Sequence, residues 1–466
     1  MGERIAVIGC GYVGSVAAGC LASIGHEVVG VERDAARLAL LRSSVAPVHE
    51  PGLTELLAAG VESGRLRLTD DPAAALEFAD AVFLCVGTPP GPDGRPEMGA
   101  MSDAARTIAA HLRPGHVVVT KSTVPIGTGE WLAGEVRAEL ARRSRDGVPV
   151  VVVSNPEFLR EGSAVEDFLH PDRVVLGGND PGAVERVAAI YEPILAGRPG
   201  EGRVPLVRTG LSTAEMTKYA SNAFLATKIG FANEMSRLCD LFGTDVATVM
   251  DAVGLDRRIG GAFLEAGIGW GGSCLGKDLA ALVGSARDRG YEPRLLEAAV
   301  GVNEAQRQQV VDSLAGLLAP LAHRRVAVLG LAFKPGTDDV RDSPGLDVAK
   351  RLVLLGARVV AFDPMVREAD PRWGLELAGD VTSAVRGAHA VVVATAWPEF
   401  ASLDAGELLR SMGGDVLFDG RNVFDPVAMR AAGFRYVSPG RAAVGDAPGA
   451  PGPFAGAFGL AAAHEH

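Results

Sequence analysis

The chain of 466 residues is poor in cysteine. Its cysteines are odd in number, widely scattered and without CxxC spacing, which excludes a disulfide framework and a zinc site, so we expect no metal. They are Cys10, Cys20, Cys85, Cys239 and Cys274. All but Cys274 lie in apolar or glycine-rich stretches, and we predict that these four are small buried side chains.

The sequence also lacks a membrane span and an export signal. No apolar run reaches the roughly 20 residues that a transmembrane helix needs. The first residues, MGERIAVIG, have no basic stretch, apolar stretch and cleavage site in succession, and they are typical of a first strand. We therefore expect a cytoplasmic protein without a membrane partner.

Positive charge is in deficit, with 45 lysines and arginines against 57 aspartates and glutamates. The formal net charge of −12 argues against a nucleic-acid partner, because a phosphate-binding surface needs an excess of basic residues. An anionic small substrate is compatible with this charge only if its site gathers positive charge locally. The composition is otherwise that of a globular protein, and the length suffices for two or three domains.

Strands and helices alternate in the first part of the chain. Strand-like apolar runs occupy residues 4–9, 27–32, 81–87, 116–122 and 148–157. Because helical stretches separate these runs, they predict a parallel sheet with helices on both of its faces.

Helical periodicity replaces this alternation from about residue 211 to 314. A long helix is predicted over 212–242, capped by Ser212 or Thr213 and ended by Gly243. Its length is unusual for a globular helix, so we expect it to connect domains and to be covered by a second subunit.

A second alternating pattern follows, with strand-like runs within 324–334, 357–364, 388–397 and 415–422. The chain is therefore predicted to be α/β, then all-α, then α/β again. The end of the chain is rich in proline, glycine and alanine, which favours disorder. The predicted segments are 1–205, 206–315, 316–441 and a disordered tail over 442–466.

Gly9, Gly11 and Gly14 form a GxGxxG motif between the first strand and the first helix. The glycines permit a tight turn, a close approach of backbone to pyrophosphate and close helix packing. Glu32 ends the second strand, where a carboxylate binds ribose hydroxyls and favours NAD over NADP. Arg37 is within reach of the phosphates. A glycine-rich turn of another α/β protein is the alternative, and the flanking strand, helix and acid disfavour it.

The segment GIGWGGSCLGKDLAALV (267–283) predicts a reactive thiol. Its glycines lead to Cys274 at the start of a helix, where N–H groups and the helix dipole stabilise a thiolate. Lys277 adds positive charge. Asp278 is four residues further on and faces the same way, so its carboxylate can orient a water or relay a proton. A buried cysteine under a glycine loop is the alternative.

Lys218 and Asn222 form a polar pair on one face of the long helix, in a mostly apolar setting. Such donors can bind an alkoxide as its charge develops. A helix–helix hydrogen bond or a solvated helix face is the alternative interpretation.

Polar residues also follow two predicted strands, where α/β enzymes place their ligands. Glu157 and Glu161 lie in SNPEFLREG, and Ser122 and Thr123 lie in KSTVPIGT. Either glutamate could instead cap a helix. Two polar loops in one domain nevertheless favour a functional site.

Eight motifs occur in a fixed order: GCGYVG, VGTP, KSTVP, SNPEFLREG, KYASNAFLATKIGFANE, GWGGSCLGKD, LGLAFKPGTDDVRDSP and FDGRN. Together they resemble the UDP-glucose/GDP-mannose dehydrogenase family, most closely its UDP-glucose 6-dehydrogenase branch, over roughly residues 3–440. The resemblance implies an α/β fold of two Rossmann-like, doubly wound parallel-sheet domains joined by a long central helix and a small all-α region. It also implies NAD as cofactor and a nucleotide-diphosphate sugar as substrate. Because the long apolar helix over 212–242 needs more cover than one chain offers, we expect a homodimer or higher homo-oligomer.

The implied reaction is a four-electron oxidation of UDP-glucose to UDP-glucuronate that reduces two NAD. The C6 alcohol becomes an aldehyde, which Cys274 traps as a thiohemiacetal. A second hydride then leaves, and the resulting thioester is hydrolysed. dTDP-glucose or another nucleotide-sugar is the alternative substrate.

Matching motif positions extend the family's residue roles to this chain. Lys218 and Asn222 would stabilise the oxyanion and a bound water, with help from Asp278, while Thr123 and Glu157 would position that water. The implied substrate residues are Phe158, Leu159, Glu161, Lys218, Asn222, Arg258, Phe263, Leu264, Gly267, Gly271, Lys334 and Arg421. The implied cofactor residues are Gly9, Gly11, Tyr12, Val13, Gly14, Glu32, Arg37, Gly87, Thr88, Ser122, Thr123, Glu161, Lys277 and Arg341.

The chain departs from the family pattern near the cysteine. Trp270 stands where phenylalanine is usual, and Leu275 where phenylalanine is frequent. Glu265 replaces a common lysine near the base-binding loop, so it can change the preferred base. Ser273 argues against the UDP-N-acetylmannosamine branch, in which histidine typically precedes the cysteine.

Two other classes of function compete with this hypothesis. A two-electron β-hydroxyacid dehydrogenase would lack the cysteine loop and the second α/β domain, so residues 262–440 argue against it. A non-catalytic nucleotide-binding or scaffold protein would have lost part of the catalytic set, yet every matching position is intact.

Overall fold

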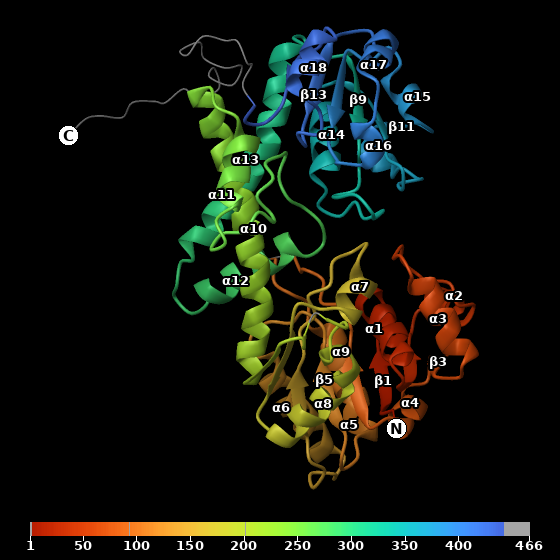
Figure 1. Ribbon diagram of the computed structural model, residues 1–466. Coiled ribbons are helices and arrows are strands. Elements are labelled where there is room, and N and C mark those ends of the chain that lie inside the picture. Colours follow the sequence, from red (N-terminus) through yellow and green to blue (C-terminus); the bar gives the residue numbers. More distant parts are fainter. Residues whose placement is uncertain (1, 93, 201, 442–466) are drawn as a thin grey trace, which may run out of the picture. The chain divides into compact units, whose positions relative to one another are not determined.

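The computed structural model describes residues 2–92, 94–200 and 202–441. The chain divides into two compact units. The first holds the residues up to Ser221 together with Ala280–Asp288, and the second holds Asn222–Leu279 and the chain from Arg289 onward. Each unit is built on a single sheet (Figure 1), which confirms the predicted α/β class with two sheets and a long central helix. The predicted tail over 442–466 lies outside the described residues.

Eight strands form the sheet of the first unit, in the order β3-β2-β1-β4-β5-β6-β7-β8. The strand pairs of this sheet are parallel, as predicted, except that β6 pairs antiparallel with β7, a strand that the sequence did not predict. The chain enters β7 from the same end of the sheet at which it leaves β6, so β7 runs in the opposite direction to β6. The strands are β1 (Arg4–Ile8), β2 (Glu27–Val31), β3 (Leu66–Thr69), β4 (Ala81–Leu84), β5 (Val117–Thr120), β6 (Val152–Ser154), β7 (Val174–Gly178) and β8 (Leu206–Thr209).

Helices cover both faces of this sheet, as predicted. Side chains alternate along each strand, so each face of the sheet carries apolar side chains that pack against helices. Ile5 and Val7 of β1 point into one apolar core and Ala6 points into the other. The first core includes residues of α1, α3, α7 and α8, and the second includes residues of α4, α5 and α6. The helices are α1 (Tyr12–Ser23), α2 (Ala35–Arg42), α3 (Leu53–Glu62), α4 (Pro72–Phe78), α5 (Gly99–His111), α6 (Thr128–Arg142), α7 (Ala164–Leu169), α8 (Pro181–Ile190) and α9 (Glu192–Leu195).

The second unit contains a six-stranded parallel sheet with the order β11-β10-β9-β12-β13-β14. Its strands are β9 (Arg325–Leu329), β10 (Arg358–Phe362), β11 (Glu376–Leu377), β12 (Ala390–Val393), β13 (Val416–Asp419) and β14 (Arg435–Val437). Its short helices are α14 (Pro344–Leu354), η1 (Pro371–Trp373), α15 (Val381–Val385), α16 (Pro398–Ala401), α17 (Ala405–Ser411) and α18 (Pro426–Ala431). The four helices that precede this sheet along the chain are α10 (Leu211–Phe242), α11 (Val246–Gly254), α12 (Leu275–Arg287) and α13 (Arg294–Leu317).

The long helix α10 runs through the residues predicted for it. It begins at Leu211, so Ser212 lies inside the first turn and the predicted N-cap at Ser212 or Thr213 is wrong. The Ser212 hydroxyl instead donates to the Glu130 carboxylate at 3.2 Å. Gly243 follows the last helical residue with φ of +67°, a left-handed backbone that suits glycine at a helix end.

Strand order reverses at one point in each sheet, between β1 and β4 and again between β9 and β12. In open α/β sheets, ligands bind outside the carboxyl ends of the strands at such a reversal. The burial of Cys10, Cys20, Cys85 and Cys239 confirms their prediction as small core side chains, whereas Cys274 is exposed. Within the described ranges, no helix combines the length and apolar character needed to cross a bilayer.

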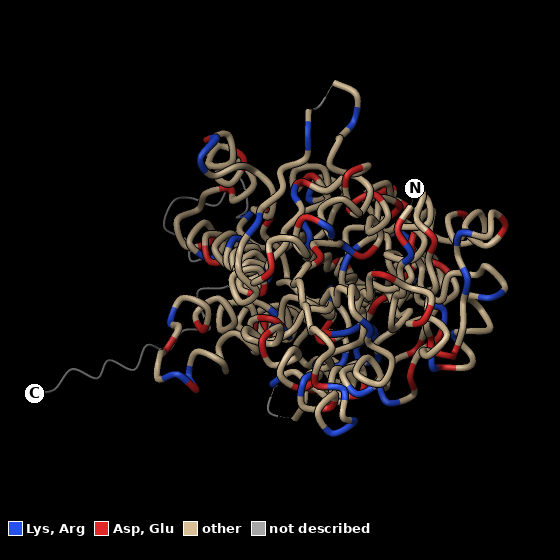
Figure 2. Tube along the Cα trace, turned by 90° about the horizontal axis from the view of Figure 1, so that it is seen from below, with Lys and Arg blue, Asp and Glu red and all other residues tan. Residues whose placement is uncertain are grey.

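Acidic and basic residues are interspersed along the trace rather than gathered by sign (Figure 2). Many of them form exposed ion pairs, such as Arg4 with Asp80 at 2.8 Å and Arg203 with Glu192 at 2.9 Å. Exposed pairs of this kind contribute little stability because water screens them.

Candidate active site

The glycine motif lies where the chain passes from β1 into α1. Gly9 has φ of +90°, and a Cβ on Gly14 would lie 1.8 Å from the Gly9 carbonyl oxygen, so both positions require glycine. A Cβ on Gly11 would meet no described atom within 4 Å. This open side next to the N-terminus of α1 fits a pyrophosphate held by backbone N–H groups.

Glu32 follows β2 and is buried, with a relative exposure of 3%. Its carboxylate accepts hydrogen bonds from the backbone N–H groups of Cys10, at 3.2 Å, and Asp34, at 2.9 Å. Arg37 donates to the same carboxylate at 3.2 Å. Glu32 is thus anchored beside the glycine motif, which fits the predicted role of binding the adenosine ribose of NAD.

The loops after β4 and β5 hold further predicted cofactor residues. Thr88 donates to the Thr123 carbonyl at 2.7 Å, and Ser122 donates to the Val86 carbonyl at 2.7 Å. Gly87 is exposed between these contacts. These hydrogen bonds join the segments that follow β4 and β5, next to the point between β1 and β4 where strand order reverses.

Tyr12, in the glycine motif, is tied to the loop that follows β6. Its hydroxyl bonds the buried Glu50 carboxylate, which also accepts from the Gly162 N–H at 2.8 Å. Val13 and Glu161 are half-buried nearby in sequence. Glu50 was not among the predicted site residues, because a lone glutamate in a loop carries no local signal.

Glu157 and Lys218 form a buried ion pair in the first unit. The Lys218 ammonium lies 3.2 Å from the Glu157 carboxylate, with side-chain exposures of 5% and 7%. The Thr123 hydroxyl donates to the same carboxylate at 3.4 Å, and the Phe158 ring lies 5.6 Å from the ammonium. Burial acts to raise the pKa of Glu157, but the charge of Lys218 and the Leu159 N–H outweigh it, so the pKa is lowered. The structure therefore brings the side chains of Thr123 and Lys218 into contact with Glu157.

Lys121 is a second buried lysine beside this pair, and it was not predicted. It donates to the Asn155 side chain at 3.2 Å and lies over the rings of Phe168 and Tyr191. Burial lowers its pKa to about 8, although the charges of Cys85 and Glu157 oppose the shift. Its position after a valine-rich strand could have signalled a strand-end residue, but its burial depends on partners far away in the sequence.

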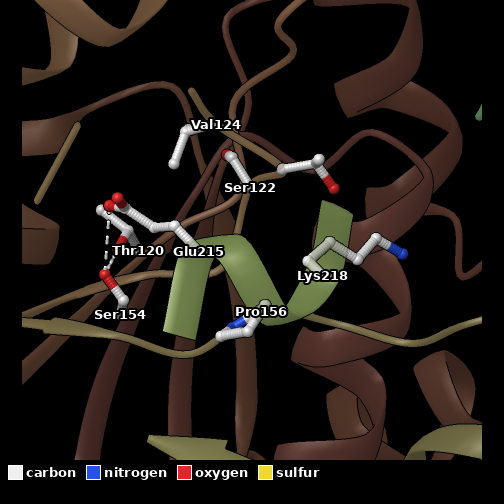
Figure 3. Close-up of a pocket in the computed structure, with 8 residues that line it drawn as sticks. Thr120, Ser122, Val124, Ser154, Pro156, Glu215 and Lys218 are labelled. Carbon is white, nitrogen blue, oxygen red and sulfur yellow. Dashed lines mark hydrogen bonds between the residues drawn. The ribbon is translucent and has the colours of Figure 1, made fainter. Parts of the chain in front are cut away.

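Residues of this region line a small pocket (Figure 3). Helix α10 contributes Lys218 and Glu215 to it, and the ends of β5 and β6 contribute the rest. The other lining residues are Thr120, Ser122, Thr123, Val124, Ser154 and Pro156.

Cys274 immediately precedes α12, as predicted, and its side chain is exposed. The Asp278 N–H donates to the Cys274 carbonyl at 2.9 Å, which closes the first turn of the helix. The buried Asp278 carboxylate accepts from Asn222 and from Lys277, each at 2.6 Å. The second unit thus brings together Asn222, Lys277 and Asp278 at the start of the cysteine helix.

The loop before Cys274 lies against the carboxyl ends of β9 and β13. Arg421 donates to the Gly269 carbonyl at 3.1 Å and to the Ala394 carbonyl at 2.8 Å. A Cβ on Gly267 would lie 2.9 Å from the Gly420 carbonyl oxygen, and one on Gly271 would lie 2.1 Å from that of Asp342. The predicted glycines are therefore required by close backbone packing.

Two predicted basic residues, Arg421 and Lys334, lie beside this loop in the second unit. Burial and the charge of Arg307 lower the pKa of Arg421 to about 10. Lys334 is half-buried and lies 5.7 Å from the Phe333 ring, whose edge closely approaches Gly272. Arg421 and Lys334 are thus two cations beside the loop that leads to Cys274, and their predicted role in binding substrate stays a prediction.

The remaining predicted residues have other partners in the structure. Arg341 is exposed and pairs with Asp339 at 2.7 Å, while its carbonyl accepts from the Gly272 N–H. Arg258 is exposed and pairs with Asp256 at 2.6 Å. Phe263 has φ of +64°, and the adjoining Leu264 is buried. The substrate and cofactor roles of these residues stay predictions.

The chain matches one protein family along most of its length. Residues 3–195, 212–305 and 327–426 match the NAD binding domain, the central domain and the UDP binding domain of the UDP-glucose/GDP-mannose dehydrogenase family. The chain is 42% identical over 446 residues to the UDP-glucose 6-dehydrogenase TuaD of Bacillus subtilis, covering 95% of this chain and 94% of that protein. It is 45% identical over 430 residues to the UDP-glucose 6-dehydrogenase AglM of Haloferax volcanii, covering 90% and 97%.

A solved structure is also similar to the chain. The UDP-glucose dehydrogenase of the hyperthermophilic archaeon Pyrobaculum islandicum matches with a TM-score of 0.84 at 40% identity, over 94% of this chain and 97% of that one. The chain therefore belongs to the UDP-glucose/GDP-mannose dehydrogenase family and is an NAD-dependent oxidoreductase.

Proposed function

We propose that the protein oxidises the C6 alcohol of UDP-glucose to the carboxylate of UDP-glucuronate, with Cys274 as a covalent nucleophile. The observation that carries this proposal is the exposed Cys274 thiol at the N-terminus of α12, followed by Asp278 with its two bonded donors. A dehydrogenase that stopped at the aldehyde would have no need of a thiol there. NAD supplies the acceptor for each of the two hydrides.

Lys218 serves the first oxidation. Its ammonium donates to the C6 oxygen as negative charge develops there, while the hydroxyl proton passes to a water ordered by Thr123 and Glu157. Loss of a hydride then leaves the aldehyde. The Glu157 carboxylate, 3.2 Å from Lys218, pairs with the ammonium and orients it in a buried setting.

Cys274 serves the second oxidation. Its thiolate adds to the aldehyde carbon, and protonation of the oxygen gives a thiohemiacetal. Loss of the second hydride and of the hydroxyl proton gives a thioester. Water attacks the thioester and releases the carboxylate and the thiol, so the complete reaction consumes one water and releases three protons. Asn222 and Asp278 orient this water.

Positive charge in the second unit suits the diphosphate of the substrate. Arg421 and Lys334 supply it beside the loop that leads to Cys274. A diphosphate bound there would replace water around both cations, and hydrogen bonds to charged donors are the strong ones. A thiol that must stay reduced, together with an NAD requirement, suits the cytoplasm.

The reaction is tested by measuring NADH formed per nucleotide-sugar consumed, in parallel assays with UDP-glucose, dTDP-glucose and GDP-mannose. We expect two NADH per UDP-glucose and release of UDP-glucuronate, detected by anion-exchange chromatography. Preference for dTDP-glucose would keep the mechanism and correct the base, for which the exposed Glu265 is the first residue to substitute. One NADH per sugar would contradict the covalent mechanism, and turnover with none of the three would contradict the substrate class.

We further propose that a second copy of the chain covers one face of α10. Phe224, Phe231 and Leu238 recur every seventh residue and are 66%, 46% and 40% exposed. Leu241 and Phe242 extend the stripe with exposures of 67% and 76%. A row of large apolar side chains along a single helix is typical of a subunit interface, and a self-complementary stripe suits a twofold dimer.

This assembly is tested by light scattering coupled to size-exclusion chromatography. We expect the wild-type protein to have at least twice the mass of one chain and Phe231→Glu to shift the population to monomers, because a charge would be buried in an apolar interface. Leu354→Glu is the matched control, since Leu354 is 85% exposed on α14 outside the stripe. A monomeric wild-type protein, or a Phe231→Glu variant with unchanged mass, would contradict this assembly.

A further inference from the structure

Glu215 is a buried carboxylate that the proposed mechanism does not use. It lies three residues before Lys218 on α10 and is 4% exposed. Its carboxylate accepts from the backbone N–H groups of Gly127, at 2.6 Å, and Gly129, at 2.7 Å. The Ser154 hydroxyl, at the end of β6, donates to it at 3.3 Å (Figure 3). Glu215 therefore joins α10 to both α6 and β6.

The partners of Glu215 are suited to a carboxylate. The N–H groups at the N-terminus of a helix have no partner within the helix, and the helix dipole favours negative charge there. Gly127 directly precedes α6, with φ of +96°, and Gly129 lies in its first turn. A Cβ on Gly129 would lie 3.2 Å from the Glu215 carboxylate and 2.9 Å from the Leu211 side chain. Absence of a side chain at this position lets α10 approach α6 closely.

The same two turns of α10 are held at a second point by the Lys218 pair. Glu157, which Lys218 contacts, is three residues beyond Ser154, which Glu215 contacts. A shift or rotation of α10 that released Glu215 from α6 would also displace the Lys218 ammonium, because both project from one rigid stretch of helix. Misplacement of about 1 Å in a catalytic group is enough to lower a rate by about a hundredfold.

We propose that Glu215 is a positioning residue, which sets the place of the Lys218 ammonium by docking the start of α10 onto the N-terminus of α6. This role rests on the proposed function, in which Lys218 binds the reacting oxygen. In this role Glu215 acts through Lys218 rather than by contact with the sugar or the cofactor. Its carboxylate has to be ionised for both oxygens to accept the two N–H groups fully.

The pH dependence of Glu215 supports a role beyond stability. Burial and, to a smaller extent, the charge of Glu130 raise its pKa to about 7, although the hydrogen bonds from the Gly127 and Gly129 N–H groups act to lower it. Charged groups near it include Glu130 on α6 and Lys218 on its own helix, whose ion-pair partner is Glu157. A raised carboxyl pKa means that the folded chain binds a proton more tightly, so stability is greatest in acid and falls as pH rises through about 7. The ionised Glu215 therefore costs stability in neutral and alkaline solution.

The Glu215→Gln variant tests this role, because an amide can accept from only one of the two N–H groups. At pH 8 we expect kcat for UDP-glucose to fall about tenfold or more with KM for both substrates unchanged. The unfolding temperature should stay the same or rise. In the wild-type protein kcat should decline as pH falls through about 7, where Glu215 gains its proton, and this decline should disappear in Glu215→Gln.

Two control variants test whether the effect on kcat is specific to Glu215 or common to buried carboxylates of α10. Asp240→Asn alters another buried carboxylate of α10, which accepts from the Gly440 N–H at 3.2 Å and whose pKa burial raises to about 7. It should keep the wild-type kcat and pH profile. Glu130→Gln should leave the plateau unchanged and move the acid decline to lower pH, because it removes a charge that raises the pKa of Glu215. Equal losses of kcat in Asp240→Asn and Glu215→Gln would overturn the proposal.

Hydrogen–deuterium exchange provides a readout that needs no turnover. Peptides that contain Gly127–Gly129 and residues 211–222 should exchange faster in Glu215→Gln than in the wild-type protein, and Asp240→Asn should leave both peptides unchanged. Unchanged exchange in Glu215→Gln would overturn the proposed docking even if UDP-glucose proved not to be the substrate. Faster exchange with unchanged kcat in an active enzyme would overturn the positioning role and leave the proposed function intact.

Discussion

Replacing Cys274 with serine is expected to lower the steady-state rate of acid formation by about a thousandfold or more. A serine hydroxyl at the same helix N-terminus does not ionise near neutral pH, so it cannot trap the aldehyde as the thiolate does. The first oxidation uses Lys218 rather than the thiol and should persist. Rapid-quench assays should therefore detect the aldehyde and at most one NADH per active site.

The control for this experiment removes a thiol elsewhere. Cys239 is buried on α10, and Cys239→Ala should keep activity within about twofold once any loss of stability is corrected. Iodoacetamide should inactivate the wild-type protein by alkylating Cys274, the exposed cysteine, and should leave the buried ones unmodified. Full acid production by Cys274→Ser, or inactivation of that variant by iodoacetamide, would contradict covalent catalysis.

Replacing Lys218 with methionine is expected to lower kcat by about a hundredfold or more, because it removes the donor to the developing oxyanion. It should also destabilise the fold by about 3 kcal/mol, since Glu157 is left as a buried charge without its cation. The pKa of Glu157 is lowered in the wild-type protein, so the pair stabilises the fold above the ordinary carboxyl range and this contribution is lost in acid. Denaturant unfolding at pH 8 and at pH 4 should show the destabilisation mainly at pH 8.

A double variant separates the two effects of Lys218. Lys218→Met combined with Glu157→Gln leaves no buried charge at this pair, so most of the lost stability should return. Activity should not return, because the oxyanion donor is still missing. Recovery of kcat together with stability would show that Lys218 only maintains the fold, and the proposed chemistry would then need another donor.

The candidate site residues whose position in the fold was predicted correctly are those whose signal is local. The glycine motif, the carboxylate after β2 and the cysteine before α12 each depend on a few consecutive residues and on one strand or helix end. Local geometry fixes which groups such a segment presents, whatever surrounds it. The strand β7 was not predicted, and the predicted N-cap of α10 was wrong, because a shift of one or two residues at a helix end has little local signature.

The amino-acid sequence by itself determined the α/β class, the NAD-type glycine motif and the presence of a candidate nucleophile, because each follows from periodicity or from a short motif. Only the tertiary structure decided which buried charges meet. Glu157 pairs with Lys218 across 61 residues, and Glu215 accepts from Gly129 across 86. The environment of a buried charge is set by packing between distant segments, and no local pattern encodes it.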